Sequence, residues 1–163
     1  MEARTLHAPL NALSAATRPP GIEIATLTTF DIPALAVLTL EAYGDDVTPE
    51  ALLETSEELR LTFEGAFGAT TEDSFVGAWD GGTLVGAILV VRESPWDDAP
   101  DGPFVVDLIV APDYRRRGIA TALVAEVAGR CASWGFGSLA LRLDSRHGGA
   151  NELYSVLGFE EIA

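Results

Sequence analysis

Apolar residues recur along the chain with two different spacings. Alternating positions, or runs of about four to eight apolar residues, predict strands, whereas recurrence every three or four positions predicts helices. The longest helical pattern follows Ile119 and places Leu123, Val127 and Cys131 on one face. In chain order, the pattern predicts strands at 22–27, 75–79, 83–91, 104–110, 139–143 and 159–162, and helices at 31–43, 48–64, 117–134 and 149–157.

Turn and cap residues mark the ends of these elements. Asp31 with Pro33 predicts one helix start, Gly44 predicts the end of that helix, and residues 80–82 (Asp-Gly-Gly) predict a tight hairpin. Antiparallel strands come first and strand–helix alternation comes last. The order β-α-α-β-β-β-α-β-α-β therefore predicts an α+β fold, a mixed α/β sandwich whose central, mostly antiparallel sheet is flanked by helices.

Residues 1–21 show no sustained periodicity and end in Arg-Pro-Pro-Gly. We therefore expect an extended or loosely tethered N-terminal arm over 1–21 and a single domain over 22–163. A chain of 163 residues, of which 48% are apolar, has enough core-forming side chains for one domain.

The charge balance argues against a broad nucleic-acid surface. Ten basic residues, all of them arginine, stand against 25 acidic residues and give a formal charge of −15. The basic cluster at 115–117 is too small for a nucleic-acid footprint but suits a local anion site. The negative field would attract cationic small molecules or basic peptides, and a solvated acidic surface explains the same charges equally well.

Cys131 is the only cysteine, so an intramolecular disulfide is excluded, and no residue set has the spacing of a metal site. No segment approaches about 18 uninterrupted apolar residues, and the first twenty lack the apolar stretch of a signal peptide. We therefore expect a cytoplasmic protein with no metal and no membrane attachment.

Residues 110–121, Val-Ala-Pro-Asp-Tyr-Arg-Arg-Arg-Gly-Ile-Ala-Thr, lie between an apolar strand and the longest helix. A helix start presents unpaired N–H groups and the positive end of the helix dipole, and small residues such as Gly118 and Ala120 let a phosphate approach the backbone. The segment matches neither G-x-x-x-x-G-K-[ST] nor G-x-G-x-x-G. It predicts a pyrophosphate site of another kind, with a solvated basic turn as the alternative.

The spacing Arg-x-x-Gly-x-Ala at Arg115, Gly118 and Ala120, after Val-Ala-Pro at 110–112, resembles the acyl-CoA pyrophosphate signature of the GNAT superfamily of N-acetyltransferases. Residues 153–159, Leu-Tyr-Ser-Val-Leu-Gly-Phe, resemble the tyrosine-containing C-terminal motif of that family. The resemblance implies a GNAT-like fold. It also implies an enzyme that moves an acetyl group from acetyl-CoA to a primary amine of a small molecule or protein, by direct attack in a ternary complex.

The resemblance also implies roles for individual residues. Main-chain groups of the strand would pair with the pantetheine arm, the amides of residues 116–120 with the Thr121 hydroxyl would hold the pyrophosphate, and Arg115 or a neighbour would add a charge-assisted contact. Many relatives carry an asparagine where this chain has His147. Asn151 supplies that contact, His147 replaces it, or His147 is an exposed loop residue. The cofactor set is Leu108, Ile109, Val110, Arg115, Arg116, Arg117, Gly118, Ile119, Ala120, Thr121 and Asn151.

Two residues are the candidates for catalysis. Tyr154 matches the family tyrosine that protonates the leaving CoA thiolate, and a packed helix tyrosine is the alternative reading. Asp107 interrupts an apolar strand, where a carboxylate is costly to bury unless it is paired or exposed in a cavity, so it is the first candidate for the general base. Some relatives carry a glutamate at the position of Phe104. The other candidates for the base are Glu72, Asp73, Glu93 and an ordered water.

The acceptor pocket of the family maps onto residues 43–50 and 96–101, both of which are acidic. We therefore expect a cationic amine acceptor. The alternative function is a non-catalytic acyl-CoA-binding or regulatory module with the same fold. The sequence stops soon after residue 158, so we expect the family's final hairpin to be missing, replaced by the N-terminal arm or supplied by a partner chain in a homodimer.

Overall fold

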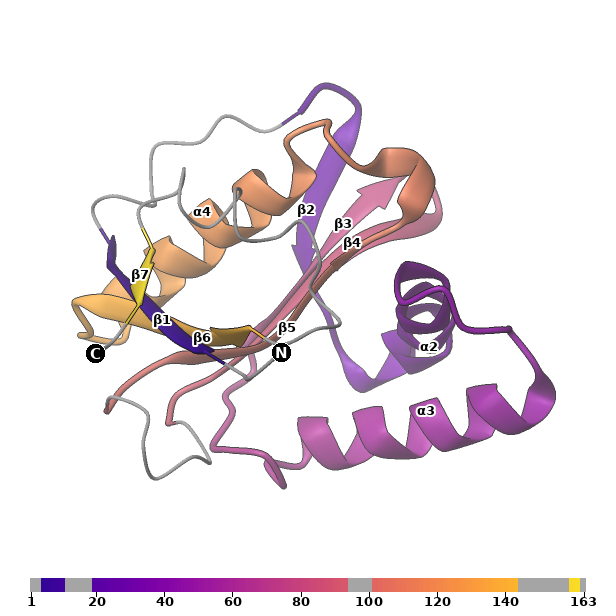
Figure 1. The fold of residues 1–163 in the computed structure, drawn as a ribbon, viewed down its shortest axis with the longest axis horizontal. Helices are drawn as coiled ribbons and strands as arrows, with labels where there is room; N and C mark the ends of the chain where they lie inside the picture. The colour runs from indigo at the N-terminus through magenta and orange to yellow at the C-terminus, as the bar shows by residue number, and fades with distance from the viewer. Residues whose placement is uncertain (1–3, 11–18, 94–100, 144–158, 162–163) are drawn as a thin grey trace.

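The computed structural model, which describes residues 4–10, 19–93, 101–143 and 159–161, contains a twisted sheet between helices (Figure 1). The strands of the described residues follow the order β2-β3-β4-β5-β6-β1-β7. Neighbouring strands are antiparallel except β5 and β6, which are parallel. This arrangement confirms the expected α+β fold with a mixed, mostly antiparallel sheet. The strands are β1 (Arg4–Pro9), β2 (Ile22–Thr26), β3 (Phe75–Asp80), β4 (Thr83–Val91), β5 (Phe104–Val110), β6 (Ser138–Leu143) and β7 (Glu160–Glu161).

Helices cover both faces of the sheet (Figure 1). Helix α4 (Ile119–Ser133) packs on one face, where its buried residues join those of β3, β4 and β6 in one apolar cluster. Helices α2 (Ile32–Ala42) and α3 (Pro49–Phe63) pack on the other face, where they form a second cluster with β3, β4 and β5. The sheet is therefore the shared wall of two cores, and β5 contributes to both. Short 3-10 turns, η1 (Thr29–Asp31) and η2 (Pro112–Tyr114), precede α2 and α4.

The N-terminal residues are part of the sheet. Strand β1 lies between β6 and β7, with Arg4 opposite Leu143 and Pro9 opposite Ser138. Of the two expected forms of the arm, Arg4–Pro9 has the extended one, because Leu6 and Ala8 of this short strand are buried in the cluster under α4. A domain start near Ile22 leaves out a strand of the same sheet.

The position of β1 also bears on the expected partner chain. We considered either the N-terminal arm or a second copy as the element that completes the sheet beyond the last strand. Strand β1 pairs with β6 along its whole length. A partner chain is therefore not needed to fill that position, and the homodimer stays an untested prediction.

The helix starts agree with the sequence pattern, with one difference. The Thr48 side chain accepts a hydrogen bond from the Ala51 amide (3.1 Å), as expected for the cap of α3. Asp31 precedes α2, but its carboxylate accepts from the Thr28 amide (2.8 Å) and closes a capping box around η1 instead. The helix expected at 149–157 lies outside the described residues.

Candidate functional site

The loop between β5 and α4 brings a helix start to the middle of the sheet. Gly118 is the N-cap of α4 and has a left-handed backbone, with φ of 83°. The first main-chain bond of the helix joins the Ala122 amide to the Gly118 carbonyl (3.0 Å). The amides of Ile119, Ala120 and Thr121 therefore precede the first such bond and lack an i−4 acceptor, as at any helix start. These donors belong to the expected pyrophosphate site.

Arg116 has an uncommon backbone conformation in this loop. Among the described residues it is the one non-glycine with positive φ, at 63°. A left-handed backbone costs an L-residue about 1–2 kcal/mol, so the surrounding structure must maintain it. With Gly118 also left-handed, the loop turns twice within three residues before the helix begins. Strain of this kind is concentrated at binding and catalytic sites.

The three consecutive arginines have different surroundings. Arg115 donates from Nε to the Val110 carbonyl (3.1 Å) and from Nη2 to the Ala42 carbonyl (2.6 Å). Arg117 lies over the ring of Tyr114, with its guanidinium carbon 4.9 Å from the ring centre. Arg116 is exposed, and within the described part of the chain its side chain has no hydrogen bond or ion pair. Arg115 thus faces α2, and Arg116 is the arginine left for an anion.

Tyr114 links this loop to the hairpin between β3 and β4. Its hydroxyl donates to the carboxylate of Asp80 (2.6 Å). That hydrogen bond is the main cause that raises the pKa of the Tyr114 phenol above its ordinary value. Tyr114 therefore stays protonated at neutral pH and serves as a fixed platform for Arg117.

Strand β5 has few described pairs with β6. It pairs with β4 from Phe104 to Val110, but its described pairs with β6 are Phe104 with Ala140 and Val105 with Leu141. The described part of β6 ends at Leu143, so among the described residues no strand pairs with the far edge of β5 near the loop. The pantetheine contact of the end of β5 stays a prediction.

The alternation of the strand decides which of these groups face the opening. The Ala111 amide donates to the Val85 carbonyl of β4 (2.8 Å), so residues two apart from Ala111 also face β4. Ile109 therefore directs its main-chain groups toward β4, whereas Leu108 and Val110 direct theirs toward the open side. Of the three strand residues expected to contact pantetheine, Ile109 is on the wrong side for main-chain pairing.

A β-bulge sets the direction of the Asp107 side chain. Leu89 of β4 lies opposite Asp107 and the next residue, Val90, lies opposite Val105, so Val106 is the extra residue. On the two sides of the bulge, Val105 belongs to the cluster under α4 and Ile109 to the cluster under α2. Strict alternation would put both on one face, so the bulge turns Asp107 from the α4 core toward α2.

Tyr43 meets Asp107 at that face. Tyr43 is the C-cap residue of α2, and its hydroxyl donates to Oδ1 of Asp107 at 2.5 Å. Both side chains are half-buried. A short hydrogen bond to an ionised carboxylate offsets part of the cost of removing that charge from water. The structure thus pairs Asp107 with Tyr43, the first residue of the segment expected to line the acceptor pocket, for which no such contact was expected.

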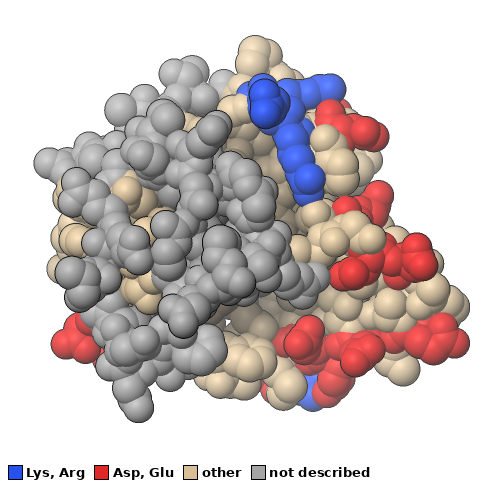
Figure 2. Space-filling model, in the orientation of Figure 1, with Lys and Arg blue, Asp and Glu red and all other residues tan. Residues whose placement is uncertain are grey.

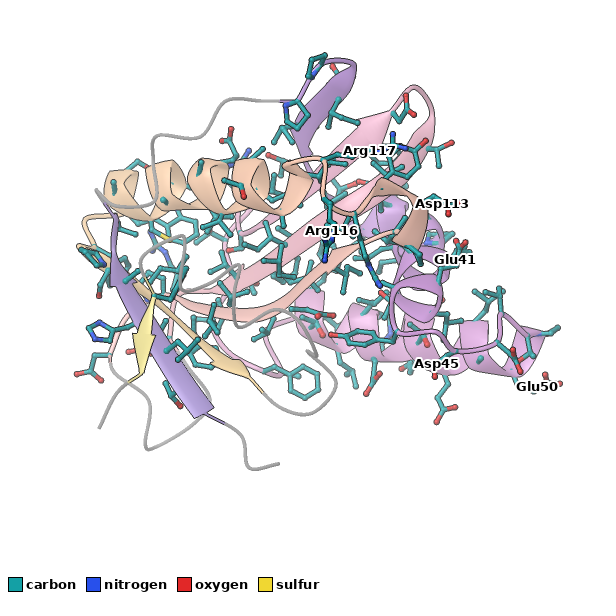
Figure 3. The ribbon with its side chains drawn as sticks, turned by 45° about the horizontal axis from the view of Figure 1, so that its top comes forward. Glu41, Asp45, Glu50, Asp113, Arg116 and Arg117 are labelled. Carbon is teal, nitrogen blue, oxygen red and sulfur yellow. The ribbon has the colours of Figure 1, made fainter. Side chains whose placement is uncertain are left out.

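Two basic side chains lie in this loop, and acidic side chains lie on the neighbouring segment that runs from α2 to α3. Figure 3 labels Arg116 and Arg117 in the loop before α4, and Glu41, Asp45 and Glu50 along α2, the following turn and the start of α3. These acidic residues are exposed. Figure 2 shows acidic side chains over the helical side of the molecule and a narrower basic streak beside them.

The other candidates for the general base have different surroundings. Asp73 accepts from the Thr71 hydroxyl (2.6 Å) and from the Trp134 indole (3.2 Å) at the C-terminal end of α4. The bond from Thr71 is the main cause that lowers the pKa of Asp73. Glu72 and Glu93 are exposed. Asp107 is the candidate that lies on β5 itself.

Several expected site residues lie outside the described part of the chain. They are Tyr154, Asn151, His147 and residues 96–100 of the acceptor loop. Cys131 is fully buried, and burial raises the pKa of its thiol to about 12, which leaves it an inert core side chain. The described residues contain no group of three or more metal-binding side chains and no helix long and apolar enough to cross a membrane.

Comparison with known proteins adds a family match. The family model described as Acetyltransferase (GNAT) family matches residues 37–159, which is more than half of the chain. No curated protein matches the sequence.

Solved structures share the fold at low sequence identity. The GCN5-related N-acetyltransferase of Sphaerobacter thermophilus matches with a TM-score of 0.69 and 24% identity, over 98% of this chain and 48% of that chain. This chain thus spans about half of that protein. The ribosomal-protein-S18-alanine N-acetyltransferase of Escherichia coli matches with a TM-score of 0.63 and 20% identity, over 87% of this chain and 79% of that chain. The PaiA N-acetyltransferase of Thermoplasma acidophilum, solved with coenzyme A, matches with a TM-score of 0.63 and 19% identity, over 85% of this chain and 89% of that chain.

Proposed function

Because the chain belongs to the acetyltransferase (GNAT) family, we propose that it moves an acetyl group from acetyl-CoA to a primary amine, by direct attack while both substrates are bound. The family assignment and the coenzyme A in one similar structure support acetyl-CoA as the donor. The kind of amine, small molecule or protein, is the part that this proposal leaves to experiment.

One observation carries the proposal: positively charged side chains lie at the N-terminal end of helix α4, where the helix dipole disfavours positive charge. Three arginines precede α4, whose N-terminus is the positive end of its dipole. A charge of unfavourable sign at a helix end costs about 0.3–1 kcal/mol. A bound anion would relieve this repulsion and accept hydrogen bonds from the first amides of the helix. The absence of a Cβ at Gly118 fits a pyrophosphate at this position, as does the guanidinium of Arg116, which has no partner among the described residues.

The end of the described β5–β6 pairs at Val105 is compatible with the rest of the cofactor along β5. The open-side main-chain groups of Leu108 lead along β5 toward the loop, in line with a pantetheine arm between Asp107 and the pyrophosphate site. The Val110 carbonyl is already engaged by Arg115. We therefore assign the main-chain contacts to Leu108 and to the Val110 amide, and the pyrophosphate contacts to Arg116 and residues 118–121.

Bound acetyl-CoA would supply the thioester, whose C–S bond breaks as the new C–N bond forms. Asp107 takes the proton that the acceptor nitrogen loses, directly or through one water. The Tyr154 hydroxyl, outside the described residues, gives a proton to the leaving sulfur. Proton transfer by one positioned side chain contributes about 10²–10⁴-fold to the rate.

The proposed acceptor is a cationic amine such as a polyamine or a basic peptide. The exposed carboxylates of Glu41, Asp45 and Glu50 support this choice, because they would concentrate cations near the α2 side of β5. A net charge of −15 acts in the same direction. A cytoplasmic location is part of the proposal and is supported by the single, buried cysteine.

The test is a melting curve with and without acetyl-CoA, followed by thiol release over a panel of amines on the same sample. At 100 times its Kd, a ligand stabilises a protein by about 2.7 kcal/mol, which raises the Tm of a domain this size by about 5–10 °C. We expect such a shift, and release of free thiol with polyamines above neutral or anionic amines.

Each other outcome has a definite meaning. A thermal shift without thiol release from any amine would favour the non-catalytic acyl-CoA-binding module. No shift at all would contradict the assignment of the helix start. A preference for anionic amines would contradict the cationic acceptor alone.

A further inference from the structure

The C-terminal turn of α2 is tied to the cofactor side of the molecule at two neighbouring residues. The Ala42 carbonyl accepts from Nη2 of Arg115, and the hydroxyl of Tyr43, the next residue, donates to Asp107. The same Arg115 donates from Nε to the Val110 carbonyl at the end of β5. We call Tyr43, Asp107 and Arg115 the polar clamp.

The clamp joins residues that are far apart in sequence and central to both halves of the site. Arg115 immediately precedes the strained Arg116 in the loop assigned to the pyrophosphate. Asp107 lies on the strand assigned to pantetheine, on the face to which the bulge turns it. Tyr43 leads into Gly44, whose left-handed backbone starts the acidic turn before α3. The clamp is thus a direct connection between the cofactor loop and the acceptor side.

We propose that Tyr43 and Arg115 are positioning residues for the acceptor amine: Tyr43 acts by orienting the Asp107 carboxylate, and Arg115 by fixing the end of α2 against β5. This inference rests on the proposed acetyltransferase function. It also changes the expected role of Arg115, from a ligand of the pyrophosphate to a link between the two substrate sites.

Physical chemistry favours this role over simple cohesion. A general base works only within hydrogen-bond distance of the proton it removes, so its orientation matters as much as its presence. One phenol bond at 2.5 Å restricts the rotation of the Asp107 carboxylate. A guanidinium is also suited to a helix C-terminus, where its charge and its planar set of donors both fit the last carbonyls. Arg115 bonds one such carbonyl, which holds Tyr43 in register with β5.

The first experiment is a double-mutant cycle on kcat/KM for the best amine of the panel. We expect Tyr43→Phe to lower it about 10- to 100-fold, the usual effect of losing a hydrogen bond to a charged group, and Asp107→Asn to lower it about 10²- to 10⁴-fold. If Tyr43 acts through Asp107, the double variant is no worse than Asp107→Asn alone. The Kd of acetyl-CoA should stay within about threefold throughout.

The control removes a similar bond within helix α2. Thr39→Val deletes the hydrogen bond from the Thr39 hydroxyl to the Leu35 carbonyl (2.7 Å). We expect it to change kcat/KM for the amine by no more than about twofold, the usual limit for a substitution away from the site. An equal loss in Tyr43→Phe and Thr39→Val would contradict a specific role for Tyr43.

The second experiment separates the two roles of Arg115. We expect Arg115→Met to raise KM for the amine about 10-fold and to leave the Kd of acetyl-CoA within about threefold, with Arg115→Lys recovering part of the loss. A pyrophosphate ligand would show the reverse, a large rise in the Kd of acetyl-CoA with a smaller effect on the amine. That reverse pattern would overturn the assignment of Arg115.

The outcomes also distinguish the inference from the proposed function. If the wild-type protein releases no thiol with any amine, the proposed function fails and the inference falls with it. If the wild type is active and the Tyr43→Phe and Asp107→Asn losses multiply in the double variant, the proposed function stands and the inference is wrong.

Discussion

The two ends of helix α4 have the same types of residue, glycine and arginine, but these residues have different surroundings. Each end is marked by a glycine with positive φ, Gly118 at 83° and Gly135 at 94°. A Cβ added at either glycine would have no atom of another described residue, chain neighbours apart, closer than 3.8 Å. Arginine side chains lie at both ends. The difference between the ends is therefore not one of backbone shape or of residue type.

The difference lies in where the polar groups find partners. At the C-terminal end, Arg130 donates to Glu126, Thr26 and the Asp73 carbonyl, and its charge has the sign that a helix C-terminus favours. At the N-terminal end, Arg116 has no such partner among the described residues and its charge opposes the dipole. One end is built for stability, whereas the other gives up local stability, as expected of the proposed binding site.

The largest effect should come from placing the same negative charge at both ends. Gly118→Glu should raise the Kd of acetyl-CoA at least about 100-fold, because like charges held together cost several kcal/mol. Gly135→Glu bears the same backbone strain of about 1–2 kcal/mol and should leave the Kd unchanged. Isothermal calorimetry measures both affinities, and circular dichroism checks both folds. Equal losses of affinity would erase the functional difference between the ends.

A smaller effect should follow from removing one cation at each end. Arg116→Gln should raise the Kd of acetyl-CoA about 10- to 100-fold, the usual range for a hydrogen bond to a charged group. It should also raise the Tm of the free protein by about 1–4 °C, because it removes a charge that opposes the helix dipole. Arg130→Gln should do the opposite and lower the Tm by about 3–6 °C with the same Kd. If Arg130→Gln weakened binding, the two ends would have to be treated as one coupled unit.

The smallest effect should come from Asp73, which the stable end uses as an acceptor. Asp73→Asn should lower the stability by about 1 kcal/mol at pH 7. The pKa of Asp73 is lowered in the folded protein, chiefly by the Thr71 hydroxyl, from a usual value of 3.8. Its contribution is therefore present above pH 4 and lost as the pH falls through the lower folded value. Urea unfolding at pH 7 and pH 3 measures the difference in the free energy of unfolding between the wild type and Asp73→Asn. This difference should be smaller at pH 3, and an equal difference at both pH values would refute this account.

Sequence periodicity predicted the elements whose apolar pattern is long and regular. The run of β4, the stripe of α4 and the hairpin at residues 80–82 were all found in the structure, because each is determined by neighbouring residues. Strand β1 was missed. Two alternating apolar residues, Leu6 and Ala8, in a six-residue strand are too weak a pattern, and their burial depends on β6, which follows more than a hundred residues later.

The side-chain contacts of the candidate site that the sequence did not predict are contacts between distant segments. Asp107 was found as a polar residue in an apolar strand, but its direction comes from a bulge that forms only in pairing with β4. Nothing in the sequence around Tyr43 marks it as the partner of Asp107. Likewise, the motif spacing located Arg115, while the carbonyl at the end of α2 determines where its side chain goes. Local sequence thus located the loop, and tertiary contacts assigned its side chains.

Strand β1 has a consequence for the order in which the protein folds. During synthesis β1 leaves the ribosome more than a hundred residues before its partners β6 and β7. Until β6 is made, the apolar residues Leu6 and Ala8 lack the strand that holds them in the core. Joining such distant segments is slow, because loop-closure entropy is lost before the contacts form. The hairpin of β3 and β4 can form early, whereas β1 stays unpaired, and open to chaperones and to aggregation, until β6 has been made.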